Sequence, residues 1–158
     1  MPEITPCLWF DDQAEQAAEF YLSVFPNSRI VETAHYTDAN PGQAGRVMIV
    51  AFELDGRRFV GLNGGPQFQF DEAISFQIDC ETQDDVDHYW SRLTEGGEEG
   101  PCGWLKDRFG VSWQVVPRRL LDLLRESDAE TAARVTTCLY AMKKIDIAAI
   151  EQAATVPA

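Results

Sequence analysis

The stretch that decides the fold of this chain is residues 73–93, AISFQIDCETQDDVDHYWSRL. Its first part, residues 73–80, alternates apolar and polar side chains, which is the period of a half-buried strand. Its second part follows Thr82, a residue type that often caps helices, and then repeats apolar side chains at helical spacing. These apolar residues are Val86, Tyr89, Trp90 and Leu93. The stretch therefore predicts a strand followed directly by an amphipathic helix that ends at Gly96-Gly97.

The N-terminal part of the chain repeats this order. Residues 4–10, ITPCLWF, predict a strand, Asp12 with Glu15 resembles a capping pair, and a helix is expected to run to about Phe25. A shift of 69 positions superimposes the apolar faces of the two helices. The matched pairs are Ala17 with Val86, Phe20 with Tyr89, Tyr21 with Trp90, and Val24 with Leu93. This agreement indicates a structural duplication.

Three strand-like runs follow each helix. In the first copy, Asp55-Gly56 joins the last two runs as a hairpin turn. The runs are residues 29–36, 47–54 and 58–63 in the first copy, and 98–102, 104–106 and 112–116 in the second. We therefore predict an α+β fold of tandem βαβββ modules in a single domain, 1–158, with modules at residues 1–66 and 70–117. Each module buries its helix on one sheet face and leaves the other face to line a shared cavity.

Residues 118–158 are expected to form a helical tail. Helices are predicted from near Pro117 and again after Ser127, a candidate cap, and the segment IDIAAIEQAA closes the tail. Val135, Leu139 and Met142 recur at helical spacing, which is more typical of packing on the body or on a second subunit than of a cofactor site.

The composition excludes several functional classes. With 26 acidic and 13 basic side chains, the net charge of -13 opposes binding to nucleic acid or to an anionic membrane. No stretch approaches the roughly 18 apolar residues of a membrane span, and the start MPEITPCLWF does not resemble a secretory leader. The four cysteines are widely spaced, which indicates free thiols rather than a zinc or redox site. We therefore expect a cytoplasmic protein.

Alternation along the strands sorts the side chains into two faces. Ile74, Phe76 and Ile78 are expected to pack on the helices, and so are Val111, Trp113 and Val115 of the last strand. The cavity face then carries Ser75, Gln77, Asp79, Ser112, Gln114 and Val116. The same rule groups side chains on one face of each of three further strands. The groups are Thr5, Cys7 and Trp9 on the first strand, Phe59, Gly61 and Asn63 on the strand after Asp55-Gly56, and Cys102, Trp104 and Lys106 in the second copy.

Eight residues form the candidate ligand-binding site. They are Trp9, His35, Asn63, Gln77, Cys102, Trp104, Lys106 and Gln114. Aromatic walls with a few hydrogen-bonding groups are typical of small-molecule sites. Asn63, Gln77 and Gln114 are equally well explained as ordinary polar sheet residues, and Cys102 as an inert buried thiol. Lys106 beside Trp104 can hold an anionic ligand. His35, next to a loop rich in Gly and Pro, can serve as a neutral acceptor or general base, whereas His88 is expected on a helix surface.

Six segments carry a resemblance to a known family over nearly the whole chain. They are ITPCLWFDD, EFYLSVF, GLNGGPQFQF, AISFQIDCETQDDVDHYWSRL, CGWLKDRFGVSWQVVP and AMKKIDIAAIE. The chain resembles the PhnB-like branch of the vicinal oxygen chelate (glyoxalase and bleomycin-resistance) superfamily, whose members are often labelled 3-demethylubiquinone-9 3-methyltransferase-like. The resemblance implies a homodimer, and for catalytic relatives a divalent metal held by four strands.

The metal positions of that superfamily fall on poor ligands in this sequence. They correspond to Ile4 or Thr5, to Asn63, to Ala73 and to Gln114. Divalent metals of this kind need several nitrogen or carboxylate donors, so we expect no bound metal and no cofactor. Methyl transfer is also poorly supported, because GLNGGP is followed by strand-like sequence and not by the helix of a nucleotide-binding loop.

The leading hypothesis is a dimeric, metal-free protein that binds a small molecule, or an enzyme of unknown reaction. The alternatives are a metal-dependent lyase, isomerase or dioxygenase of the glyoxalase kind, an interaction module that uses the tail, and a quinone methyltransferase. Kinship of fold cannot choose among them, because one scaffold supports many chemistries.

Overall fold

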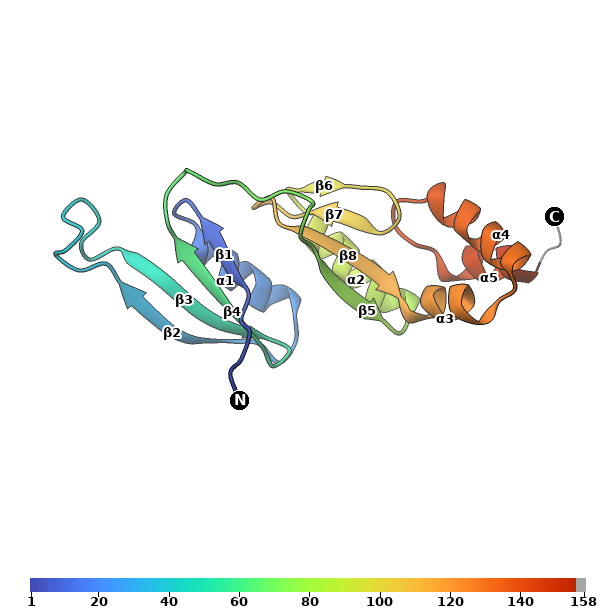
Figure 1. Ribbon diagram of the computed structural model, residues 1–158, viewed down its shortest axis with the longest axis horizontal. Coiled ribbons are helices and arrows are strands. Elements are labelled where there is room, and N and C mark those ends of the chain that lie inside the picture. The colour runs from blue at the N-terminus through green and yellow to red at the C-terminus, as the bar shows by residue number, and fades with distance from the viewer. Residues whose placement is uncertain (156–158) are drawn as a thin grey trace. The chain divides into compact units, whose positions relative to one another are not determined.

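The computed structural model describes residues 1–155 as two compact units, unit 1 from Met1 to Phe70 and unit 2 from Asp71 onward (Figure 1). Each unit holds one four-stranded sheet with a helix packed on one face. The element order strand-helix-strand-strand-strand occurs once in each unit. The predicted α+β class with duplicated βαβββ modules is therefore confirmed.

In unit 1 the strand order is β1-β4-β3-β2, and β1 runs parallel to β4 while the other pairs are antiparallel. The elements are β1 (Cys7–Phe10), α1 (Ala14–Val24), β2 (Arg29–His35), β3 (Val47–Leu54) and β4 (Arg57–Asn63). The tight turn between β3 and β4 has positive φ at Asp55 (47°) and at Gly56 (75°). Positive φ at both central residues is the requirement of a type I′ two-residue hairpin, so the predicted turn is confirmed.

Unit 2 repeats this topology with the order β5-β8-β7-β6, and β5 runs parallel to β8. Its module consists of β5 (Phe76–Cys80), α2 (Gln83–Thr94), β6 (Glu98–Glu99), β7 (Trp104–Lys106) and β8 (Ser112–Pro117). Thr82 caps α2 as predicted: its side chain accepts the Asp85 N–H, and the Asp85 carboxylate accepts the Thr82 N–H in return.

The two module helices bury equivalent residues. Tyr21 of α1 and Trp90 of α2, which the shift of 69 positions aligns, are both buried against their own sheets. The aligned pairs Ala17 with Val86 and Val24 with Leu93 are buried as well. Each module therefore has a core of its own between helix and sheet.

Several predicted element boundaries were wrong. Asp12 and Glu15 do not cap α1, whose N-cap is Gln13 without a side-chain hydrogen bond. Ser127 does not cap α4, because the Asp128 carboxylate accepts the Thr131 N–H instead. Ile74 does not pack on a helix: it lies before β5 with an exposed fraction of 75%. Three predicted strands are shorter than expected by several residues, since β1 begins at Cys7, β5 begins at Phe76 and β6 ends at Glu99.

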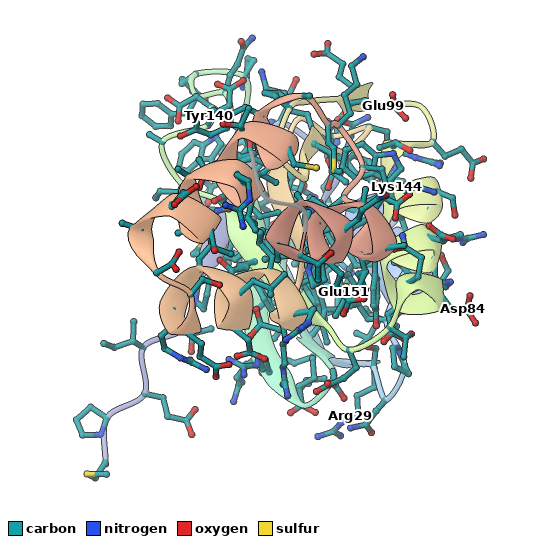
Figure 2. All side chains as sticks on the ribbon, turned by 90° about the vertical axis from the view of Figure 1, so that its right-hand side faces the viewer. Arg29, Asp84, Glu99, Tyr140, Lys144 and Glu151 are labelled. Carbon is teal, nitrogen blue, oxygen red and sulfur yellow. The ribbon has the colours of Figure 1, made fainter. Side chains whose placement is uncertain are left out.

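The helical tail consists of α3 (Arg118–Glu126), α4 (Ala129–Tyr140) and α5 (Ile147–Thr155). It packs on the end of β8 through an apolar core that contains Val116, Leu123, Val135, Ile145 and Ile150. Gln83 of α2 joins this contact, since its amide donates to the Ile145 carbonyl and accepts the Ile147 N–H. Figure 2 looks onto the tail and shows Lys144 beside α2, where it forms an ion pair with Asp87. The predicted apolar stripe is thus a packing surface.

None of the helices within residues 1–155 combines the length and the apolar character that crossing a membrane requires.

Candidate functional site

The sheet of unit 2 has an open face, defined here as the face opposite α2. Strand pairing places Gln77 beside Gln114 and Gln114 beside Trp104, so these three side chains form one row across β5, β8 and β7. Lys106 pairs with Ser112 in a second row on the same face. The structure therefore brings together four of the predicted site residues, on the face that strand alternation assigned to them.

A pocket with a volume of about 400 Å³ lies on this face, and we call it the Trp104 pocket. Trp104 and Lys106 are half-buried in its wall, and Ser112 is buried beneath them. The wall also includes Glu72, Glu98, Glu99 and Pro101. The pocket thus combines an aromatic side chain, apolar atoms and several charges within a single unit.

Lys106 is not a free cation in this pocket. Its Nζ forms an ion pair with the Glu72 carboxylate, and the hydrogen bond to Glu72 raises the pKa of Lys106. The same hydrogen bond lowers the pKa of Glu72. Two further carboxylates, Glu98 and Asp71, act on Lys106 in the same direction. Glu72 lies in the segment before β5, and no sequence pattern pointed to it.

The loop at residues 100–103 forms one wall of the Trp104 pocket. The Gly100 N–H donates to the Trp104 carbonyl at 2.8 Å, and the Trp104 N–H donates to the Pro101 carbonyl at 3.0 Å. Gly103 has φ +83°, and an added Cβ there would lie 2.7 Å from the Val115 carbonyl oxygen, so only glycine fits. The loop is therefore held tightly against β7 and β8.

Cys102 lies in this loop and not on a strand, which corrects the prediction that it shares a strand face with Trp104 and Lys106. It has a positive φ of 57°, and its Sγ lies 3.8 Å from the Leu139 carbonyl of the tail. Its N–H donates to the Met142 carbonyl at 2.9 Å. Cys102 is thus engaged with the tail, and it is not among the residues that line the Trp104 pocket.

The two glutamines of the open face are bound to neighbouring polar side chains. The Gln114 amide donates to the Ser75 hydroxyl at 2.9 Å, and the Gln77 amide donates to the Asp79 carboxylate at 2.8 Å. Gln77 is exposed and Gln114 is half-buried. Neither hydrogen bond uses the side-chain carbonyl oxygen of the glutamine. Both residues can therefore still accept a hydrogen bond from a ligand.

Asp107 is a structural residue that the sequence reasoning missed. Its side chain is buried, with an exposed fraction of 3%, and it accepts the N–H groups of Phe109 and Val111 and the indole N–H of Trp113. These hydrogen bonds fix the turn between β7 and β8. The Asp-x-x-Gly pattern of residues 107–110 was the available signal, because Asp and Gly favour tight turns.

In unit 1, Trp9 lies on the sheet face opposite α1. Its indole N–H donates to the Gly65 carbonyl at 2.9 Å, and its ring meets the Phe68 ring edge to face at 4.9 Å. An added Cβ on Gly64 would come within 2.4 Å of the Trp9 ring, so the glycine permits this close packing. The segment after β4 therefore covers part of Trp9.

Asn63 lies on the α1 side of the same sheet and does not share a face with Trp9. Its Oδ1 accepts the Ala14 N–H at 2.8 Å, and its Nδ2 donates to the Val47 carbonyl at 3.1 Å. A second pocket, with a volume of about 720 Å³ and a more polar wall, adjoins Asn63 and Tyr36. His35, the residue before Tyr36, is exposed at the end of β2 and is not in the wall of this pocket.

The residues at the superfamily's metal positions do not fit a divalent metal. Asn63 uses both polar atoms of its side chain for backbone groups, and Ala73 has no donor. Gln114 and Thr5 provide only neutral oxygen atoms. Across residues 1–155, no three His, Cys, Asp or Glu side chains gather into a metal-binding group. No chemical step is therefore assigned to a metal.

Comparison with known proteins places this architecture in a family. The family model for 3-demethylubiquinone-9 3-methyltransferase matches residues 2–116, which span both modules. The chain belongs to this family. The resemblance to the PhnB-like branch of the vicinal oxygen chelate superfamily is thereby confirmed.

Three solved structures are among those similar to this chain. The PhnB protein from Bacillus cereus is 33% identical, with a TM-score of 0.65, and the match covers 73% of this chain and 99% of that one. Protein PA1353 from Pseudomonas aeruginosa is 18% identical, with a TM-score of 0.61, and the match covers 74% of this chain and 98% of that one. The fosfomycin resistance protein FosX from Listeria monocytogenes is 19% identical, with a TM-score of 0.48, and the match covers 71% of this chain and 88% of that one. A search of curated proteins found no match.

Proposed function

We propose that this chain binds a small molecule in the Trp104 pocket, on the open sheet face of unit 2. The observation that supports this is a cavity of about 400 Å³ that joins a half-buried aromatic side chain to an ion pair. Small-molecule sites commonly have volumes of about 300–1,000 Å³ and combine apolar walls with a few polar groups. The Lys106–Glu72 ion pair and the Ser112 hydroxyl are the polar groups of the wall that can orient the ligand.

We further propose that the open sheet face of unit 1, opposite α1, is covered by another layer in the assembled protein. Trp9, Ile49 and Leu62 share that face and are only half-buried there. An apolar sheet face is normally covered by another layer. A homodimer is the assembly that family membership suggests. Four free cysteines favour a reducing compartment, and we place the protein in the cytoplasm.

We propose binding over methyl transfer, the reaction in the family's name. A methyl-donor nucleotide commonly sits where a glycine-rich loop leads from a strand into a helix. Gly64 and Gly65 instead lead from β4 into a connection of turns and loops without a helix, and the Gly65 carbonyl accepts the Trp9 indole N–H. Saturable binding of a methyl-donor nucleotide would revive the methyltransferase hypothesis.

A thermal-shift screen with a broad metabolite panel tests the proposal. A ligand that binds only the folded chain stabilises it by about 2.7 kcal/mol at a hundred times its dissociation constant. We expect at least one metabolite to raise the melting temperature saturably, and Trp104→Leu to abolish this rise. Tyr140→Leu is the matched control, because Tyr140 is an aromatic residue of the tail with an exposed fraction of 72%. A panel without any hit would favour the interaction module instead.

Elemental analysis of the purified protein separates metal-free binding from glyoxalase-like catalysis. Stoichiometric metal that is removed by a chelator together with an activity would favour the metal-dependent lyase, isomerase or dioxygenase. We expect no such metal, because the donor set described above is too poor.

A further inference from the structure

The charges around the Trp104 pocket are mostly negative. Three glutamates, Glu72, Glu98 and Glu99, line it together with one lysine, Lys106. The Lys106–Glu72 ion pair neutralises one charge of each sign. Glu99 is paired with Lys143 of the tail, so Glu98 remains as the surplus and the wall carries a negative charge before any ligand enters.

The two remaining glutamates differ in how they are held. Glu99 accepts the Trp90 indole N–H at 3.0 Å and lies 3.9 Å from the Lys143 ammonium of the tail. Glu98 is exposed and pairs across β6 and β7 with Lys106, whose charge Glu72 already compensates. Glu98 is therefore the carboxylate best placed to meet an incoming positive charge.

An anionic ligand would face two obstacles in this pocket. It would have to displace Glu72 from Lys106, and its own charge would be repelled by Glu98. The net charge of -13 on the whole chain adds to this repulsion over longer distances. The expectation from sequence that Lys106 holds an anion is therefore not supported by its surroundings.

A cationic ligand would meet favourable partners at the same place. Trp104 lines the pocket, and indole rings attract cations more strongly than other aromatic side chains do. Apolar atoms of Pro101 and Leu105 adjoin the ring and offer a surface for an apolar ligand body. We propose that the Trp104 pocket takes a cationic amphipathic ligand, an organic ammonium group attached to an aromatic or aliphatic body. This inference rests on the proposed function and names the class of ligand.

Three probes that share a phenylalkyl body but differ in the charge of their end group show how binding depends on ligand charge. They are phenylpropyltrimethylammonium, phenylbutanol and phenylbutyrate, and calorimetric titration gives the dissociation constant of each. We expect the cation to bind about tenfold more tightly than the alcohol. The anion should bind most weakly. Raised salt should reduce the advantage of the cation, because exposed charges are screened.

Two variants test whether this preference arises in the pocket. Glu98→Gln should weaken binding of the cation about three- to tenfold and leave the alcohol unchanged, as expected for the loss of one exposed charge. Trp104→Leu should weaken the cation further. Glu19→Gln, a matched charge removal at an exposed position of α1, should change nothing.

The outcomes distinguish the ligand class from the function. Equal or tighter binding of the alcohol or the anion, lost in Trp104→Leu, would overturn the cationic class and leave the binding pocket in place. Failure of all three probes would also overturn the cationic class. In that case the metabolite panel, which contains ligands of every charge, decides separately whether the pocket binds small molecules.

Discussion

The side chain of Asn63, at the end of β4, caps helix α1 by accepting the Ala14 N–H at 2.8 Å. The superfamily resemblance places a metal ligand at this position, yet here the amide closes the junction between sheet and helix. Its Nδ2 also reaches the Val47 carbonyl of β3, so one side chain joins three elements of unit 1.

We expect Asn63→Ala to lower the free energy of unfolding by about 1–2 kcal/mol, because a helix N–H and a strand carbonyl both lose their partner. Urea unfolding measures the change. Asn40→Ala is the matched control, since Asn40 lies in the exposed loop beside the same pocket, and it should alter stability little. An Asn63→Ala variant as stable as the parent would refute the capping role.

Asp107→Ala should be the more damaging substitution in unit 2. It removes the acceptor of three hydrogen bonds and leaves the indole N–H of buried Trp113 without that partner. We expect a loss of roughly 2–4 kcal/mol in the free energy of unfolding, again measured with urea. Asp38→Ala, in an exposed loop of unit 1, provides the comparison. A loss below 1 kcal/mol, on the scale of an ordinary surface change, would contradict this account.

Gln83→Ala should loosen the docking of the tail. The substitution removes the hydrogen bond to the Ile145 carbonyl at 3.1 Å and the one from the Ile147 N–H at 2.8 Å. Hydrogen exchange should quicken selectively in α5, with a fall of about 1–2 kcal/mol in overall stability. Gln152→Ala, at an exposed position of α5, should leave exchange unchanged. Uniform acceleration throughout unit 2 would argue against a local role for Gln83.

The cysteines should differ in their reactivity. Burial raises the pKa of the Cys80 thiol from 9.0 to about 12, with Asp85 and Asp79 adding to the effect. Alkylation requires the thiolate, so native Cys80 should stay unlabelled near neutral pH. Burial also raises the pKa of Cys7, but to a smaller extent, and because Cys7 is exposed it should be labelled before Cys80. Mass spectrometry after timed treatment with iodoacetamide measures this order, and protein unfolded in urea should label at all four positions.

The raised pKa of the Cys80 thiol also affects the stability of the fold at alkaline pH. The Cys80 thiol ionises near pH 9.0 in the unfolded chain but only near 12 in the folded one. The unfolded state therefore gains thiolate first, and this group's contribution to stability falls as the pH rises from about 9 toward 12. In a Cys80→Ala variant, the free energy of unfolding, measured with urea, should decline less steeply between about pH 9 and 12. An unchanged pH profile in that variant would contradict the assignment.

Local patterns in the sequence predict much of the fold. The Asp55-Gly56 turn, the Thr82 cap and the shared face of Gln77, Gln114 and Trp104 depend on neighbouring residues or on strand alternation, and all three are present. Ser127 and Asp128 are both good capping residues, and the pattern alone could not choose between them.

The rest of the site depends on contacts between distant residues. Asn63 caps a helix that begins 49 positions earlier, and Glu72 pairs with Lys106 from a segment without regular structure. Neither contact leaves a periodic signal. The sequence therefore predicted a positive pocket from Lys106 alone, whereas Glu72 neutralises that charge and Glu98 adds a further carboxylate to the wall.

The tail reaches the pocket wall through main-chain atoms. The N–H groups of Cys102 and Gly103 donate to the carbonyls of Met142 and Lys143 at 2.9 and 2.8 Å. Backbone donors and acceptors are common to nearly all residue types, so these two anchors survive replacement of the Met142 and Lys143 side chains. Substitutions there can accumulate without releasing the loop. Cys102→Pro or Gly103→Pro would remove one of these two hydrogen bonds, because proline has no backbone N–H.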